Sequence, residues 1–376
     1  MLADELGATA PGRETIPYLT RMFHNPQRSR SIKYPVHPDP SHRDTMCAHR
    51  TNPVIPRSGS AFLPKPPIPG PPESLFVSTF GALLPPAQYL QTQDGKAAYY
   101  SIPPSVSHTD AQTPDNVLFV HGIQTPAIGM LPLARALHDA FSNAHFVLVD
   151  LWGHGLSDTP MIPHEATTFH RLLDALLDHL QWPSAHLIGF SFGGSLTVGY
   201  VNSRPSRVSS VTLVAPAGLL SISSFPEEDQ HHLDCGVDND DDELRRVILH
   251  FLEGGRLVVP SDWRERAGRG EVVAEAVREW QMREHPGHTA SVIAAFRDGG
   301  VMDNHDAFEK AVQSDIPALV VLGENDDVCT ERELGEIGFD DIFVIPQVGH
   351  GVVRERVPDV AGFIADFWNR LRSDRK

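Results

Sequence analysis

The sequence predicts an α/β protein built on a mostly parallel, twisted β-sheet with helices on both faces. Short apolar runs recur along the chain, and each is followed by a helical pattern or a loop. Such runs are typical of strands that are covered on both faces. They occupy residues 117–120, 146–149, 187–188, 211–214, 318–322 and 342–345. Ligands of such sheets bind beyond the carboxyl ends of the strands, so these ends are where we expect the chemistry.

Composition limits the partners of the chain. Its 376 residues are 41% hydrophobic, which is enough for a sizeable buried core. A net charge of −17 argues against nucleic-acid binding, because a phosphate backbone attracts clustered Lys and Arg. The three cysteines, Cys47, Cys235 and Cys329, are odd in number and widely spaced, so we expect neither a disulfide framework nor a Cys-x-x-Cys metal site.

The N-terminal region indicates a cytoplasmic protein. It lacks the apolar core of a secretory signal, and Asp4 and Glu5 are atypical of transit peptides. The longest apolar run near this end, residues 75–84, is interrupted by polar residues and is far shorter than a membrane span. We therefore predict no membrane span and a reducing compartment, to which the cysteine usage also points.

Residues 1–72 differ in composition from the rest of the chain. They hold 14 of the 32 prolines, and nine Lys and Arg against five Asp and Glu. Such a segment buries too little apolar surface to offset its ordering entropy, so we predict a disordered tail. The alternative is a docking arm that uses the proline-rich stretch Pro64-Lys65-Pro66-Pro67.

The remaining chain is predicted to form a core in two parts, residues 73–216 and 313–376. The core opens with a hairpin between residues 89 and 102, turning at Asp94-Gly95. Residues 217–312 contain no clear strand–helix unit, and stretches around 243–252 and 271–282 have helical periodicity. We interpret this region as a helical cap inserted after strand 6. Its acid-rich patch, residues 227–243, is read as solvated surface, since its spacing does not match the alternative of a calcium loop.

Ser191 is the candidate nucleophile. It lies in Gly189-Phe190-Ser191-Phe192-Gly193, between an apolar run and a helical pattern that begins near Gly194. A strand, a sharp turn and a helix raise the serine hydroxyl above the sheet, and the flanking glycines avoid collisions inside the turn. The following helix N-terminus supplies free N–H groups near the hydroxyl.

Two backbone amides are candidates for an oxyanion hole. Acyl transfer passes through a tetrahedral oxyanion, which needs two N–H groups aimed at one oxygen. We predict that these are the amides of Phe192 and Ile123. Ile123 follows His121-Gly122 at the end of a strand, where Gly122 lets the chain turn so that the Ile123 amide points inward.

The candidate acid follows the strand at residues 318–322. An imidazole that activates serine needs a carboxylate to fix its tautomer and orientation. Asp326 is the choice, and its neighbours Glu324 and Asp327 remain alternatives. Thr330 and Glu333 have the spacing of a capping box, which indicates that the acids lie in a loop before a helix.

The candidate base is His350, which follows the last predicted strand with glycine on either side. This leaves the ring room to turn toward the nucleophile. The pairs at His231-His232 and at His285 and His288 suggest metal ligands as an alternative, but their spacing lacks a third ligand nearby. We therefore expect neither a metal nor a cofactor.

These motifs resemble the α/β-hydrolase superfamily from about residue 89 to residue 371. Gly189 to Gly194 is similar to its nucleophile elbow, and His121-Gly122-Ile123 to its oxyanion loop. The stretch from Asp150 to Asp158, DLWGHGLSD, resembles the family's turn after strand 4. The order Ser191, Asp326, His350 is that of the family, and its Gly-x-x-Asp pattern favours Asp326 over Asp327.

The resemblance implies cofactor-free hydrolysis. We expect a serine hydrolase that cleaves an ester, thioester or related acyl bond of a small to medium apolar substrate through an acyl-enzyme. Alternatives are a carbon–carbon bond hydrolase, an acyltransferase or cyclase, or a ligand-binding protein without turnover. Epoxide hydrolases and haloalkane dehalogenases carry Asp where this chain has Ser191. The cap residues Phe251, Leu252, Trp263 and Trp280 are candidates for the pocket wall, and the oligomeric state stays open.

Overall fold

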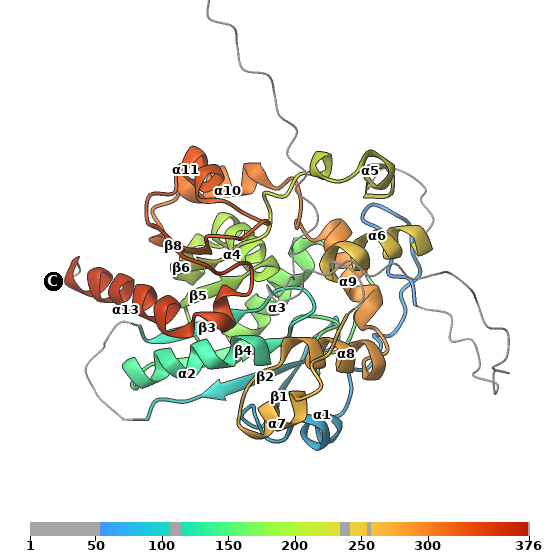
Figure 1. The fold of residues 1–376 in the computed structure, drawn as a ribbon, viewed down its shortest axis with the longest axis horizontal. Helices are drawn as coiled ribbons and strands as arrows, with labels where there is room; N and C mark the ends of the chain where they lie inside the picture. Colours follow the sequence, from blue (N-terminus) through green and yellow to red (C-terminus); the bar gives the residue numbers. More distant parts are fainter. Residues whose placement is uncertain (1–52, 106–113, 234–240, 254–256, 375–376) are drawn as a thin grey trace, which may run out of the picture.

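A computed structural model describes residues 53–105, 114–233, 241–253 and 257–374 (Figure 1). Three sequence predictions concern residues outside these ranges: most of the proline-rich tail with Cys47, the environment of Cys235, and the middle of the acid-rich patch. The third cysteine, Cys329, is buried and carries a free thiol.

Within the described residues, eight strands form one sheet in the order β1-β2-β4-β3-β5-β6-β7-β8. The first hairpin and the β2–β4 pair are antiparallel, and all other neighbours are parallel. The six apolar runs and the hairpin of the sequence prediction are confirmed as strands of this sheet. The strands are β1 (Gln88–Gln91), β2 (Lys96–Ile102), β3 (Asn116–Val120), β4 (His145–Val149), β5 (Ala185–Phe190), β6 (Val208–Val214), β7 (Ala318–Gly323) and β8 (Ile342–Ile345).

Both faces of the sheet are covered, as the apolar strands require. Along β3, Leu118 and Val120 join one core while Val117 and Phe119 join the other. The helices α3 (Ala166–His179), α4 (Phe192–Ser203) and α11 (Glu331–Ile337) lie on the first side. On the second side are η1 (Ala127–Met130), α2 (Leu131–Ala140), α12 (Val352–Glu355) and α13 (Val357–Asp374). The short elements α1 (Glu73–Phe80) and η2 (Pro205–Arg207) complete the core, and η3 (Ile222–Ser224) opens the stretch between β6 and β7.

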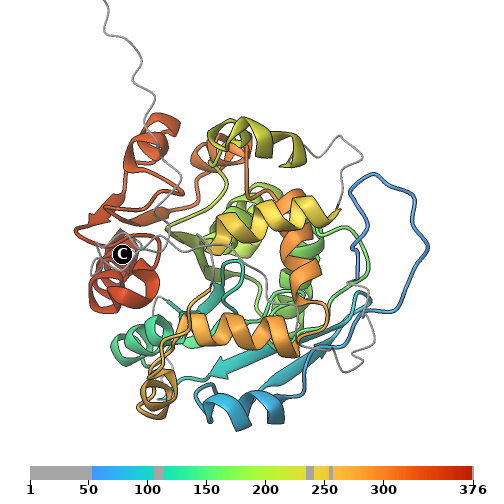
Figure 2. The ribbon, with the colours of Figure 1, turned by 45° about the vertical axis from the view of Figure 1, so that its right-hand side comes forward.

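The chain between β6 and β7 is helical and lies over the carboxyl ends of the strands (Figures 1 and 2). Its helices are α5 (Glu227–Leu233), α6 (Asp241–Glu253), α7 (Trp263–Gly268), α8 (Ala274–Glu284), α9 (His288–Asp298) and α10 (His305–Val312). The two predicted helical stretches correspond to α6 and α8. The predicted end of the cap at residue 312 is too late, because α10 packs against α4 in the core layer. There Asn202 Nδ2 donates to the Ala307 carbonyl at 2.8 Å.

Residues 53–72 are attached to the folded body, unlike the tail predicted to run to residue 72. Ile55 is 2% exposed and clusters with Met161 and Ala290. Ile68 and Thr159 exchange two backbone hydrogen bonds of 2.8 and 2.9 Å. The composition argument missed this because two separate anchors can fix a segment whose middle loops outward from the body, as the dark-blue trace does in Figure 2. Among the described helices, none combines the length and the apolar character needed to cross a bilayer.

Candidate active site

The turn between β5 and α4 holds Ser191 in a strained conformation. Its φ of 54° and ψ of −120° lie in a region that side chains rarely adopt. A Cβ atom at residue 193 would lie 2.0 Å from the Val120 carbonyl oxygen, and one at residue 189 would lie 2.4 Å from the Gly193 oxygen. Both positions therefore require glycine. Backbone hydrogen bonds to Val214 and from Ala217, of 3.1 and 2.9 Å, hold the serine from both sides.

The structure brings Ser191, His350 and Asp326 together from three separate loops. His350 Nε2 lies 2.9 Å from Ser191 Oγ, and His350 Nδ1 lies 3.2 Å from each carboxylate oxygen of Asp326. The Asp326 side chain is fully buried, and the ring of His350 is 15% exposed. Asp326 Oδ1 also accepts a 2.9 Å hydrogen bond from the Val328 amide, which fixes the carboxylate. The chain thus contains a serine, an imidazole and a carboxylate connected in series.

The neighbouring acids have other environments. Glu324 accepts a 2.9 Å hydrogen bond from the Gln347 amide. Asp327 is half-buried, and burial together with the adjacent Asp326 raises its pKa. Of the three acids considered from the sequence, Asp326 is the one hydrogen-bonded to His350 in the described part of the chain. The capping box of Thr330 with Glu333 is confirmed, and it starts α11 directly after this loop.

The two candidate oxyanion amides belong to segments next to the serine. Phe192 is the first residue of α4, and the loop after β3 approaches so closely that a Cβ at Gly122 would lie 2.8 Å from Ser191 Cβ. Apart from hydrogen bonds inside regular helices and strands, the backbone N–H groups of Ile123 and Phe192 donate to no backbone carbonyl in the described residues. The roles of both amides stay predictions.

Buried polar side chains support the loop that carries Ile123. Asp150 accepts hydrogen bonds from the Ala127 and Leu156 amides at 2.9 and 3.0 Å and from the Tyr100 hydroxyl at 2.8 Å. Burial raises the pKa of Asp150 to about 6, and these hydrogen bonds oppose the rise. Asp150 belongs to the stretch recognised after β4, but its supporting role was not predicted.

Histidines complete this support. His121 Nδ1–H donates to the Gly122 carbonyl at 2.7 Å, and its Nε2 accepts from the Leu151 amide at 2.9 Å. His154 Nε2 accepts from the Gln124 amide at 3.2 Å. Burial lowers the pKa of His121 to about 4 and holds that of His154 well below its usual range, so both rings act as neutral donor–acceptor pairs.

Comparison with known proteins agrees with this geometry. A family model described as "alpha/beta hydrolase fold" matches residues 115–235, which contain the loop after β3, the turn after β4 and the elbow at Ser191. The chain has the α/β-hydrolase fold, and this part of it matches that family's model.

Individual relatives of this α/β hydrolase are distant. The dihydrolipoyllysine-residue acetyltransferase component of an acetoin cleaving system from Pseudomonas putida is 27% identical over 216 residues, covering 57% of this chain. The chain spans about half, 53%, of that relative's length. Monoacylglycerol lipase abhd6-A from Xenopus laevis is 24% identical over 280 residues, 69% of this chain and 76% of the lipase. Among solved structures, an enol-lactonase from Burkholderia xenovorans LB400 superposes with a TM-score of 0.54 at 19% identity. The match covers 75% of this chain and all of the lactonase, and it supports the fold alone.

The aromatic residues of the hydrolase cap differ from expectation. Trp263 and Trp280, which were candidates for the pocket wall, pack against α1. Trp280 lies 5.4 Å from the Phe76 ring and Trp263 lies 5.5 Å from the Phe80 ring. Helical periodicity indicates which face of a helix is buried, but it does not show which element that face packs against. The sequence therefore could not place these two side chains. Phe251 packs between Phe225 and Phe296, and Leu252 lies partly buried at the edge of the same core.

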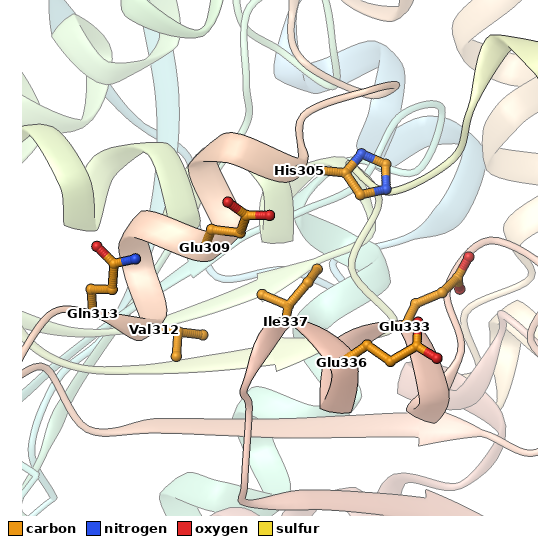
Figure 3. Close-up of a pocket in the computed structure, with 7 residues that line it drawn as sticks. All are labelled: His305, Glu309, Val312, Gln313, Glu333, Glu336 and Ile337. Atoms are coloured by element: carbon orange, nitrogen blue, oxygen red, sulfur yellow. The ribbon is translucent and has the colours of Figure 1, made fainter.

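A separate groove lies between α10 and α11 of the hydrolase core (Figure 3). It has a volume of about 460 Å³ and is lined largely by polar side chains. None of Ser191, Asp326 and His350 lines it. The lining residues are His305, Glu309, Val312, Gln313, Glu333, Glu336 and Ile337. This acidic groove therefore has no part in the arrangement around the serine.

Proposed function

We propose that this α/β hydrolase is a serine hydrolase that cleaves an ester, thioester or related acyl bond. The supporting observation is the connected series from Ser191 Oγ through His350 to Asp326, with distances of 2.9 and 3.2 Å. A serine hydroxyl becomes nucleophilic when an imidazole can take its proton, and a carboxylate at the other ring nitrogen stabilises the resulting imidazolium. The position of Ser191 at the N-terminus of α4 adds free amides where negative charge develops.

In the proposed reaction, Ser191 Oγ attacks the acyl carbonyl while His350 Nε2 takes the hydroxyl proton. The carbonyl oxygen becomes an oxyanion, which the Ile123 and Phe192 amides would stabilise. The tetrahedral intermediate collapses, the leaving group accepts the proton from His350, and an acyl-serine remains. Water then attacks with His350 as base, which releases the acid and restores the serine.

The proposed substrate is small to medium in size and apolar. Two of the compared proteins are named for acylglycerol and lactone substrates, which fits an ester. Acyl transfer to an alcohol, amine or thiol is the second candidate, because the relative from Pseudomonas putida is named as an acetyltransferase. Adding an acceptor to the assay and analysing the product separates transfer from hydrolysis.

Labelling by a fluorophosphonate together with turnover of p-nitrophenyl esters of increasing chain length tests the proposal. We expect wild type to be labelled and Ser191→Ala to lose label and at least roughly 10³-fold in kcat. Ser203→Ala is the matched control, since this exposed serine at the end of α4 hydrogen-bonds within its own helix. A folded wild-type protein that takes no label and turns over no ester faster than Ser191→Ala would contradict the proposed function.

A further inference from the structure

Several of the cap's side-chain hydrogen bonds meet on one loop of the core, the turn of residues 152–157 after β4. Four side chains from α8, α9 and the link between them each hydrogen-bond to a backbone group of this turn. The four contacts are Gly155 N to Gln281 Oε1 at 2.8 Å, His285 Nε2 to Ser157 O at 2.8 Å, His288 Nδ1 to Gly153 O at 2.8 Å, and Ser291 Oγ to Trp152 O at 2.9 Å. Because these side chains hydrogen-bond to backbone groups, they fix the position of α8 and α9 relative to the turn.

Gln281 differs from the other three because it also reaches the loop that carries the candidate oxyanion amide. Its side chain is fully buried, and both the oxygen and the nitrogen of its amide form hydrogen bonds. The oxygen accepts from Gly155, and the Nε2 group donates to the Gln124 carbonyl at 2.7 Å. The donor at Gly155 fixes which end of the amide is oxygen. Gln281 therefore bridges the turn after β4 and the loop after β3.

The residue that Gln281 holds is conformationally unusual. Gln124 follows Ile123 directly and has a φ of 64°, in the left-handed region that favours glycine. Its amide is held by His154 at 3.2 Å and its carbonyl by Gln281. The peptide on the other side of Ile123 is held by His121 through the Gly122 carbonyl. The backbone around the Ile123 amide is thus fixed on both sides, and the support from Gln281 comes from the cap.

We propose that Gln281 is a positioning residue through which the cap sets the geometry of the oxyanion loop. The inference rests on the proposed function for its kinetic consequence, although the contact itself does not depend on it. With Gln281 in place, the Gln124 carbonyl has a partner and the left-handed conformation is retained. Without it, the Gln124 carbonyl loses the hydrogen bond that Gln281 donates, so the loop relaxes and the Ile123 amide moves away from the position of the developing oxyanion.

The first experiment compares Gln281→Leu with Ser291→Ala, a matched control that also removes a cap-to-turn hydrogen bond but does not touch residues 121–127. We expect Gln281→Leu to lower kcat about 10- to 100-fold on a p-nitrophenyl ester with KM within about twofold. Ser291→Ala should retain kcat even where its Tm falls. Equal losses of kcat in the two variants would show that Gln281 acts through cap stability alone and would overturn the proposal.

Gln281→Glu provides a test that a purely structural role would not pass. A protonated Glu accepts from Gly155 and donates to the Gln124 carbonyl, as Gln does, but an ionised Glu can do only the first. The ratio of the variant's kcat to that of wild type should therefore rise toward one as the pH falls from about 8.5 to 6. Asp150, His154, His285 and His288 are present in both proteins, so the ratio isolates position 281. A ratio that does not change with pH would contradict the proposal.

Hydrogen exchange separates failure of this inference from failure of the proposed function. In Gln281→Leu, the amides of residues 123–125 and 127 should exchange at least about tenfold faster than in Ser291→Ala, whether or not the protein hydrolyses esters. Unchanged exchange in these residues would overturn the inference. If exchange responds but wild type shows no Ser191-dependent turnover or labelling, the positioning contact stands and the hydrolase proposal fails.

Discussion

Asp326 and Asp327 are adjacent in the chain, yet they differ in their relation to His350. The Asp326 carboxylate is fully buried and contacts the imidazole through both oxygens. Asp327 is half-buried and electrostatically coupled to Asp326, and such a residue contributes through its charge rather than through a defined contact. From the sequence, two adjacent aspartates after a strand gave almost equal candidates, and the family pattern was needed to choose between them.

We predict that Asp326→Asn lowers kcat on an ester by roughly 10³- to 10⁴-fold, because an amide no longer selects the His350 tautomer that accepts the serine proton. Asp327→Asn should stay within a few-fold of wild type and serves as the control. Steady-state kinetics of the two variants at pH 8, with thermal unfolding to verify folding, gives the answer. Comparable losses in both variants would assign the role to the pair rather than to Asp326.

At the scale of elements, the elbow between β5 and α4 depends on close backbone contact that excludes side chains. A methyl group at residue 193 would lie 2.0 Å from the Val120 oxygen, and backbone at that position does not yield as a flexible side chain would. Gly362 is the converse case, since it lies exposed in α13 with open space around it. Replacement by alanine should therefore change the free energy of unfolding in opposite directions at the two sites.

We expect Gly193→Ala to destabilise the protein by about 1–3 kcal/mol or more and to lower kcat, because the strain displaces Ser191 from its partners. Gly362→Ala should stabilise it by about 0.5–1 kcal/mol, because alanine restricts the unfolded chain and favours helix. Urea unfolding of both variants measures the two effects. A stable Gly193→Ala with unchanged kcat would mean that the elbow can move without consequence.

The elements that could be predicted from the sequence are those whose signal is local. The elbow, the hairpin at Asp94-Gly95 and the buried strands each show their pattern within about ten residues. Gln281 and Ile55 gave no such signal, because their roles depend on contacts with residues far away in the chain, such as Gln124 and Met161. A glutamine in a helix and an isoleucine among prolines have many possible partners. The contribution of the cap and of residues 53–72 therefore emerged from the structure.

At the scale of the whole molecule, the part of the chain that the structure describes contains a set of buried histidines with lowered pKa values. Each is at most 4% exposed, and burial is the main cause of the lowered pKa in every one. They connect the sheet, the turn after β4 and the cap, so they report on the integrity of the assembled protein. The set comprises His121, His154, His164, His170, His285 and His288.

These histidines predict that the free energy of unfolding falls steeply as the pH drops below about 6.5. The unfolded rings bind protons near pH 6.5, whereas the folded rings, with pKa values of about 3 to 4 where a value applies, stay neutral, so acid favours the unfolded chain. Between pH 7.5 and 5.5 each of the five rings with such a value contributes a loss of about 1.3 kcal/mol, together roughly 6.5 kcal/mol, and His154 acts in the same direction. Asp150 acts oppositely, because its pKa is raised to about 6 and its protonation stabilises the folded state, but by only about 1 kcal/mol over this range.

Urea unfolding at intervals of about half a pH unit between pH 7.5 and 5.5 measures this dependence. The losses from these rings are comparable to the whole stability of an ordinary domain. His285→Gln should reduce the slope of the free energy of unfolding against pH by the amount that corresponds to about one proton, because Gln does not titrate. The Gln amide can still donate to the Ser157 carbonyl that His285 contacts. A free energy of unfolding that stays constant across the range would show that the rings are not held neutral by burial. The assignment of His121 and His154 as neutral supports of the loop that carries Ile123 would then be wrong as well, because a protonated ring cannot accept from the Leu151 or Gln124 amide.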